Sequence, residues 1–73
     1  MNKYHINVFY SEDDEGYIAD IPDLKFCSAF GGTPEKAMVE VMTAQKIWLE
    51  AAIKSGRDIP KAKYRPMIYQ IAQ

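Results

Sequence analysis

The chain of 73 residues has one cysteine and one histidine, and it contains no long run of apolar residues. A single cysteine excludes an internal disulfide and a zinc site built from several thiolates. No N-terminal stretch is typical of a signal peptide, and no segment approaches the roughly 20 apolar residues of a membrane-spanning helix. We therefore expect a cytoplasmic protein that does not contact the membrane.

An excess of basic residues is absent as well. Nine lysines and arginines stand against ten aspartates and glutamates, which gives a net charge of −1. A dedicated nucleic-acid binder usually concentrates positive charge, so we expect no DNA binding by this chain alone. With 48% hydrophobic and 26% charged residues, the composition is that of one small folded domain over residues 1–73.

Three strands are predicted in the first half of the chain. Residues 4–10 alternate apolar and polar positions, and residues 17–21 and 25–30 are short runs rich in apolar residues. Gly16 closes the polar loop between the first two strands, and as a glycine it can take a positive φ, which is typical of a hairpin loop. Pro22 cannot donate to a strand ladder, so Pro22-Asp23 should begin the next turn. Cys27 then falls inside the third strand.

A long helix should follow. Thr33 suits the N-cap, Pro34 the first helical position, and Gly56 the residue after the helix ends near Ser55. Gly31 and Gly32 should let the chain turn sharply out of the sheet. The helix carries an apolar face, with Trp48 as a packing residue, made of Ala37, Met38, Val41, Met42, Gln45, Trp48, Leu49, Ala52 and Ile53.

These elements predict an α+β fold, a two-layer sandwich in which an antiparallel β-β-β meander is covered on one face by the helix. Residues 57–66 contain two prolines and read as a connector. Residues 67–73 regain strand character, so they are predicted to form either a fourth strand or an arm that pairs with another subunit.

One helix covers only one face of such a sheet. By alternation, Phe9, Ile18, Phe26 and Phe30 should lie on the uncovered face, which predicts self-association into a homodimer or larger oligomer, or binding of a protein partner. A second set of apolar residues in the tail could join that interface: Met67, Ile68, Tyr69 and Ile71.

No group of residues predicts catalysis, a cofactor site or a metal site. His5 and Cys27 lack the neighbours of a catalytic pair, and the acidic run Glu12, Asp13, Asp14 and Glu15 lacks calcium-loop spacing. Asp20 and Asp23 do not make a two-metal site, and Gly31-Gly32 lacks a phosphate-binding motif. A final short basic and aromatic segment is a weak nucleic-acid signal: Lys61, Lys63, Tyr64 and Arg65.

Taken together, the motifs resemble the HicB-like family over about residues 4 to 60. That pattern has a tyrosine-led strand, an acidic-Gly hairpin, Ala-X-X-Pro-Asp-Leu-X-Gly-Cys, Gly-X-Thr-X-Glu-Glu-Ala, a long helix and Gly-X-X-Ile-Pro. The matching positions are Tyr4, Glu15, Gly16, Ala19, Pro22, Asp23, Leu24, Cys27, Gly31, Thr33, Glu35, Ala37, Gly56, Ile59 and Pro60. Phe26 and Lys36 stand where the pattern has Gly and Glu.

HicB-like proteins are the antitoxins of bacterial toxin–antitoxin pairs, and their N-terminal module is a partial ribonuclease-H fold without the catalytic acids. The resemblance therefore implies a non-enzymatic protein that binds and masks a small HicA-like mRNA-cleaving toxin. The acidic residues 12–15 would steer the toxin toward its binding surface. Two alternatives stay open, namely an orphan structural or regulatory domain that binds a small ligand or a protein, and a degenerate nuclease.

Overall fold

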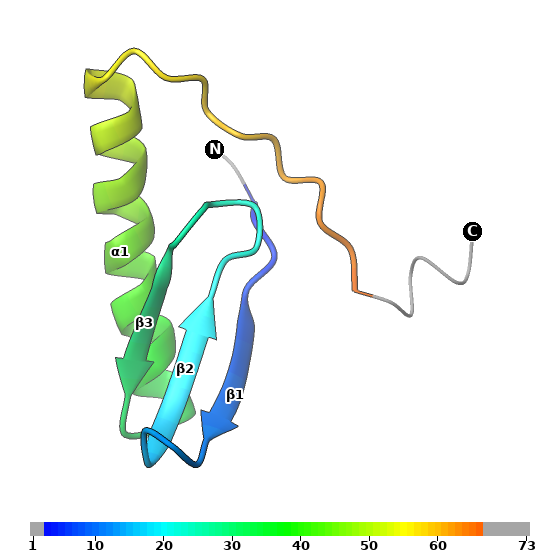
Figure 1. The fold of residues 1–73 in the computed structure, drawn as a ribbon, viewed down its shortest axis with the longest axis vertical. Coiled ribbons are helices and arrows are strands. Elements are labelled where there is room, and N and C mark those ends of the chain that lie inside the picture. The colour runs from blue at the N-terminus through cyan, green and yellow to red at the C-terminus, as the bar shows by residue number, and fades with distance from the viewer. Residues whose placement is uncertain (1–2, 67–73) are drawn as a thin grey trace.

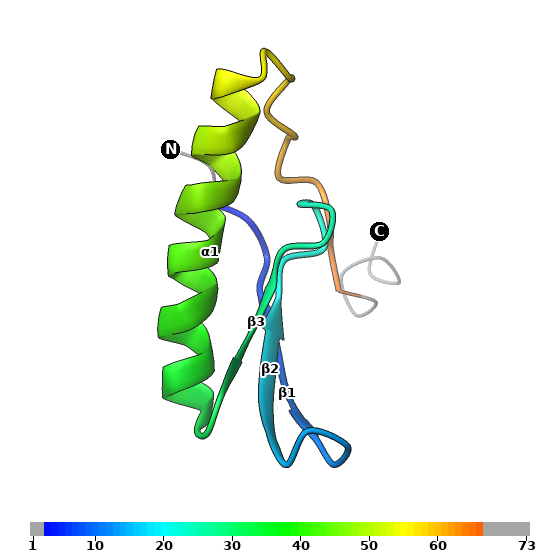
Figure 2. The ribbon, with the colours of Figure 1, turned by 60° about the vertical axis from the view of Figure 1, so that its left-hand side comes forward.

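The computed structural model describes residues 3–66 and places three strands ahead of one helix. The strands are β1 (Asn7–Ser11), β2 (Gly16–Asp20) and β3 (Ser28–Gly31), and the helix is α1 (Pro34–Lys54). The strands form one antiparallel sheet in the order β1-β2-β3. The helix lies against one face and the opposite face is bare of any other helix (Figure 1, Figure 2). This confirms the predicted α+β sandwich.

The observed strands differ from their predicted ranges. β1 and β3 lie further toward the C-terminus than predicted, and β2 lies one residue closer to the β1–β2 hairpin. β1 begins at Asn7 rather than Tyr4, and β3 begins at Ser28 rather than Lys25. Tyr4 and Ile21 are buried, yet they lie outside the strands and pack into the core from irregular backbone. Alternation of apolar residues indicates which side chains are buried, and here some buried side chains belong to residues next to the strands rather than in them.

Two consecutive β-turns build the loop between β2 and β3. The Leu24 amide donates to the Ile21 carbonyl at 3.0 Å, and the Cys27 amide donates to the Leu24 carbonyl at 3.1 Å. The first turn confirms the prediction at Pro22-Asp23. The second turn has Phe26 at its third position with a φ of 62°, where a type II turn requires a positive value. Phe26 therefore belongs to a turn, and its predicted place in a strand is wrong.

Gly16 and Gly31 are needed because neighbouring atoms pack closely against them, and not because their backbone takes a positive φ. The positive φ of the β1–β2 hairpin falls on Glu15, at 53°, although Gly16 is the residue there that could take it without strain. A Cβ at Gly16 would collide with the ring of Phe30. A Cβ at Gly31 would stand 2.7 Å from the carbonyl carbon of Lys36, so this glycine lets β3 approach the first turn of α1.

Both ends of the helix are capped as predicted. The Lys36 amide donates to Thr33 Oγ1 at 3.1 Å, Pro34 occupies the first turn, and Gly56 takes a φ of 73°. The buried stripe is narrower than expected, because Ala37, Val41 and Ala52 alone are fully buried. Three predicted core residues are exposed: Met38, Met42 and Ile53. Short alanine side chains bring the helix close to a three-stranded sheet, which is too narrow to cover the flanks of that stripe.

Residues 57–66 run from the end of α1 past the β2–β3 loop without helix or strand. This connector is packed against the body of the protein, since Ala62 contacts the core cluster and the Tyr4 hydroxyl donates to the Pro60 carbonyl. The predicted strand or arm over 67–73 lies outside the described residues. Among the described residues, no helix is both long and apolar enough to cross a membrane.

Candidate partner-binding surface

A row of large apolar side chains crosses the bare face of the sheet. Phe9 on β1 stands opposite Ile18 on β2, and Ile18 stands opposite Phe30 on β3, so the three share one face. Ala19 and Ala29 occupy the alternate positions that face the helix, and Ala19 is fully buried there. Phe9 and Phe30 remain 50% and 49% exposed. Nothing in residues 3–66 covers this row.

Phe26 does not belong to that row, although the sequence placed it there. It sits in the second turn of the β2–β3 loop and is 93% exposed, the highest exposure among the large apolar residues described. Alternation from residue to residue applies only inside a strand, and the chain leaves the strand conformation before Ser28. The exposed aromatic residues therefore occupy two separate places.

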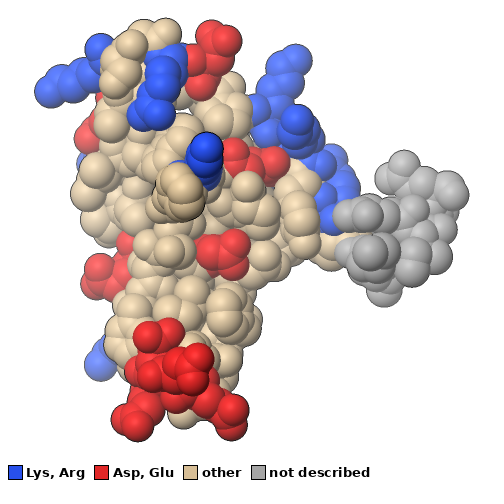
Figure 3. All heavy atoms as spheres, in the orientation of Figure 1, with Lys and Arg blue, Asp and Glu red and all other residues tan. Residues whose placement is uncertain are grey.

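The acidic residues gather at one end of the molecule. Glu12, Asp13, Asp14 and Glu15 are all exposed in the β1–β2 hairpin, at the bottom of Figure 3. Their loop is held by local bonds, since Ser11 Oγ donates to Asp14 Oδ2 at 2.8 Å and the Glu15 amide donates to the Glu12 carbonyl at 3.3 Å. Phe9 is only two residues from the end of β1, so the apolar row lies beside this acidic tip.

The remaining candidate groups are engaged in structural contacts. His5 Nε2 lies 2.7 Å from Asn7 Oδ1, and its ring centroid is 5.0 Å from that of Tyr64. Cys27 is 5% exposed, and burial raises the pKa of its thiol. Asp20 lies on the outer face opposite Ser28. Among residues 3–66, no three His, Cys, Asp or Glu side chains come together as metal ligands would.

Asp23 has a structural role that its turn position did not reveal. Its Oδ2 accepts from the amides of Lys63 and Tyr64 at 3.2 and 3.1 Å, which ties the connector to the β2–β3 loop. Its negative charge also helps to raise the pKa of Tyr4, where desolvation is the larger cause. No local sequence signal could have indicated these contacts, since they join residues 40 and 41 positions apart.

Trp48 was expected to pack in the core, and it also acts as a hydrogen-bond donor. Its Nε1 donates to the Lys25 carbonyl at 2.8 Å, and the guanidinium carbon of Arg57 lies 5.5 Å from its ring centroid. The indole therefore fixes the second turn of the β2–β3 loop against α1.

The basic residues of the connector lie away from the acidic tip. Lys61 and Lys63 are exposed. Tyr64 and Arg65 line a small cleft together with Lys3, Tyr4 and His5. Arg65 is engaged there, since its Nη1 donates to the Tyr64 carbonyl at 3.1 Å. The weak nucleic-acid signal of the sequence thus maps to a cleft between the connector and the residues that precede β1.

Comparison with known proteins identifies a relative of this domain. The chain is 36% identical over 53 residues to UPF0150 protein ssl0259 of Synechocystis sp., and the match covers 73% of each chain. The chain belongs to the UPF0150 family. Neither the scan against family models nor the search of solved structures gave a match. For this UPF0150 protein, the function is therefore inferred from the surface described above.

Proposed function

We propose that this UPF0150 protein is a HicB-like antitoxin, a non-enzymatic domain that binds a small HicA-like toxin and masks its RNA-cleaving surface. The bare face of the sheet carries the proposal. Phe9 and Phe30 are exposed on either side of the half-buried Ile18, and the three form an apolar row beside an acidic hairpin. A domain that inhibits by covering a partner needs such a surface and needs no catalytic group of its own.

The chemistry of this face suits a basic partner. Apolar side chains at the centre of an interface supply most of the affinity, and charged residues at its rim mainly raise the association rate. The hairpin residues 12–15 give one rim four negative charges. A toxin that binds RNA presents positive charge, so the rim would attract the same surface that the antitoxin has to cover. The proposal places the protein in the cytoplasm, where mRNA is cleaved.

A titration of the protein against a HicA-like toxin tests the proposal, with inhibition of RNA cleavage as the first readout and the dissociation constant as the second. Phe9→Glu should weaken inhibition at least about tenfold, because it places a charge in the apolar centre. Ile47→Glu is the matched control, since Ile47 is an exposed apolar residue on the far side of α1, at 61% exposure. Equal inhibition by both variants contradicts the assigned surface.

Neutralising the hairpin charges distinguishes their effect on the association rate from an effect on the dissociation rate. The variant that combines Glu12→Gln, Asp13→Asn, Asp14→Asn and Glu15→Gln should associate more slowly, and its association rate should lose most of its salt dependence. Its dissociation rate should change little. The protein alone should leave single-stranded RNA intact in the presence of Mg²⁺. Cleavage that Asp20→Asn abolishes would favour the degenerate nuclease instead.

A further inference from the structure

The face of the sheet that carries α1 is open over β1. Val8 lies opposite Ala19, which is fully buried on the helix side of the sheet. Tyr10 lies opposite Tyr17, and the two rings meet edge to face with their centroids 5.3 Å apart. Opposite residues of an antiparallel pair share a face, so Val8 and Tyr10 also point to the helix side. They are nevertheless 39% and 54% exposed, because α1 does not cover them.

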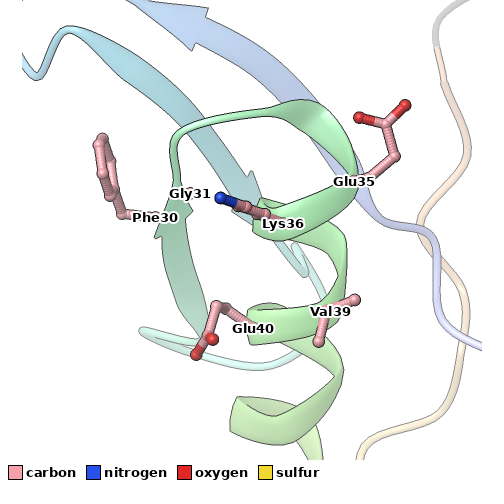
Figure 4. A pocket seen from close by; sticks show the side chains of 6 residues that line it. All are labelled: Phe30, Gly31, Glu35, Lys36, Val39 and Glu40. Atoms are coloured by element: carbon pink, nitrogen blue, oxygen red, sulfur yellow. The ribbon is translucent and has the colours of Figure 1, made fainter.

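This opening follows from the position of α1 across the sheet. The helix contacts β3 most extensively and β1 least. A Cβ at Gly31 would collide with the backbone of Ala37, so the first turn of α1 lies directly against the end of β3. Lys36 and Glu40 line a pocket there together with Phe30, as Figure 4 shows. One flank of α1 therefore faces the outer edge of β3, and the other flank faces the space over β1.

The flank toward β1 carries an apolar stripe. Successive helix residues are about 100° apart around the axis. Ala37 and Val41 are buried against the sheet, and the residues before them, 36 and 40, line the pocket at β3. The residues after them, Met38 and Met42, must then lie on the side of β1. They are 39% and 45% exposed, whereas Leu49, two turns beyond Met42, packs partly against the core.

Strand and helix thus form one apolar patch around the space over β1, which we name the β1–α1 surface. Its members are Val8, Tyr10, Met38 and Met42. It lies on the opposite side of the sheet from the row that contains Phe9, since neighbouring residues of a strand point to opposite faces. Nothing in residues 3–66 covers it. The two methionines can adapt their flexible side chains to a partner.

Acidic residues border one end of this surface. Tyr10 lies two residues before the hairpin residues 12–15, which carry four negative charges. The helix begins at the same end of the sheet as the hairpin, as Figure 1 and Figure 2 show. Glu35, three residues before Met38, sets a fifth negative charge in the first turn of α1. Lys46 lies about two turns further along the helix, away from the hairpin. The charge of the border therefore favours a basic group at the hairpin end.

The width of the open space suits one helix. Neighbouring strands are about 4.8 Å apart, so β1 and β3 are separated by about 10 Å. Packed helices lie about 8–10 Å apart. Because α1 lies mainly over β3, a second helix packed beside it would lie over β1. Its apolar side would contact Val8 and Tyr10 on the sheet and the two methionines on α1.

We propose that the β1–α1 surface binds a basic amphipathic helix of a partner protein, seated beside α1 and over β1, with its Lys and Arg residues at the hairpin end. Burial of apolar side chains supplies the affinity, and the five carboxylates select for positive charge and orient the helix. The proposal does not depend on the antitoxin function, because it uses the other face of the sheet.

Fluorescence anisotropy with synthetic peptides and the full chain tests the chemistry of the site. The probe is a labelled helix of about five turns, with leucines at i, i+3, i+4 and i+7 spacing and lysines toward one end. A peptide with glutamate in place of each lysine should bind at least about tenfold more weakly, and so should a peptide with the same composition in scrambled order. The proposal is overturned if the basic peptide does not bind at about 1 mM, or if the glutamate peptide binds equally well.

Neutral substitutions test the location without changing the charge. Met42→Asn should weaken binding of the basic peptide at least about tenfold. Ile47→Asn is the matched control and should not, since Ile47 is 61% exposed on the same helix but outside the β1–α1 surface. Thermal denaturation checks that both variants are folded. Phe9→Glu should keep peptide binding while it impairs toxin inhibition, which separates this proposal from the proposed function. Equal effects of Met42→Asn and Ile47→Asn overturn the assigned location.

Two other occupants of the β1–α1 surface would give different results. A second copy of the chain would appear in sedimentation equilibrium as a dimer that Met42→Asn dissociates. Residues 67–73 of the same chain would compete with the peptide, so the peptide would bind only after these residues are deleted. Either result overturns the proposal, whereas peptide binding by a full-length monomer supports it.

Discussion

The two loops of this sheet are built in opposite ways. The hairpin at residues 12–15 is held by hydrogen bonds within itself and with Ser11, and all four of its residues are exposed. The β2–β3 loop at residues 21–27 buries Ile21, Leu24 and Cys27 and bonds to Trp48 and to the connector. The hairpin presents charged side chains without supporting other parts of the fold, whereas the β2–β3 loop joins the sheet, the helix and the connector.

This contrast explains where substitutions are expected to be tolerated. Contacts confined to a few residues hold a loop in shape without supporting anything else, so its side chains are available to a partner. Contacts that bridge distant segments stabilise the whole domain. A chain of 73 residues has a small hydrophobic core, so the loss of such a contact should lower its stability noticeably.

The largest contrast in stability should come from Leu24 and Asp14. Leu24 is 1% exposed at the centre of the β2–β3 loop, so Leu24→Ala should lower the free energy of unfolding by about 2–5 kcal/mol. Asp14→Ala in the hairpin should change it by about 0.5 kcal/mol or less. Urea denaturation measures both values. Similar losses for the two variants would mean that the loops do not differ in the way described.

Thiol reactivity should show the same contrast. Burial raises the pKa of Cys27, so the folded protein holds little of the reactive thiolate at pH 8. Alkylation of Cys27 should be at least about 100-fold slower than alkylation of Asp13→Cys, measured in a Cys27→Ala background. Because a raised pKa keeps the thiol protonated, the Cys27 rate should still increase at a pH where the hairpin thiol has levelled off. Equal rates at pH 8 would show that the β2–β3 loop opens readily.

A smaller effect is expected at the link between the loop and the connector. Asp23→Ala removes the acceptor for the Lys63 and Tyr64 amides, and because these bonds are exposed it should cost about 1 kcal/mol. The released connector should be cut by trypsin after Lys61 and Lys63 several-fold faster than in the wild type. Asp13→Ala should leave the cleavage rate unchanged, and a rate that Asp23→Ala does not raise would remove the proposed role of the carboxylate.

The smallest effect should come from the backbone of the hairpin. Glu15 has a φ of 53°, so Glu15→Gly should stabilise the protein by about 0.5 kcal/mol or less, because the relieved backbone conformation is partly offset by the entropy of glycine in the unfolded chain. Glu12→Gly is the control and should destabilise, since Glu12 does not share the positive φ. Thermal denaturation distinguishes the two directions.

Much of the fold was predictable because its signals are local. Thr33, Pro34 and Gly56 mark the ends of α1, and the Pro22-Asp23 turn forms where the sequence places it. Phe9 and Ile18 share a face because alternation holds within a regular strand. The strand limits were less predictable, since Tyr4 and Ile21 are buried without belonging to a strand.

By itself, the sequence determined the order of the elements, the helix ends and the apolar row, because each depends on spacing along the chain. Only the tertiary structure decided the positions of Phe26 and Asp23. Phe26 projects from a turn that Trp48 holds from another element, and the Asp23 carboxylate binds a segment about 40 residues away. These contacts form through space between distant residues, so no periodicity or local motif encodes them.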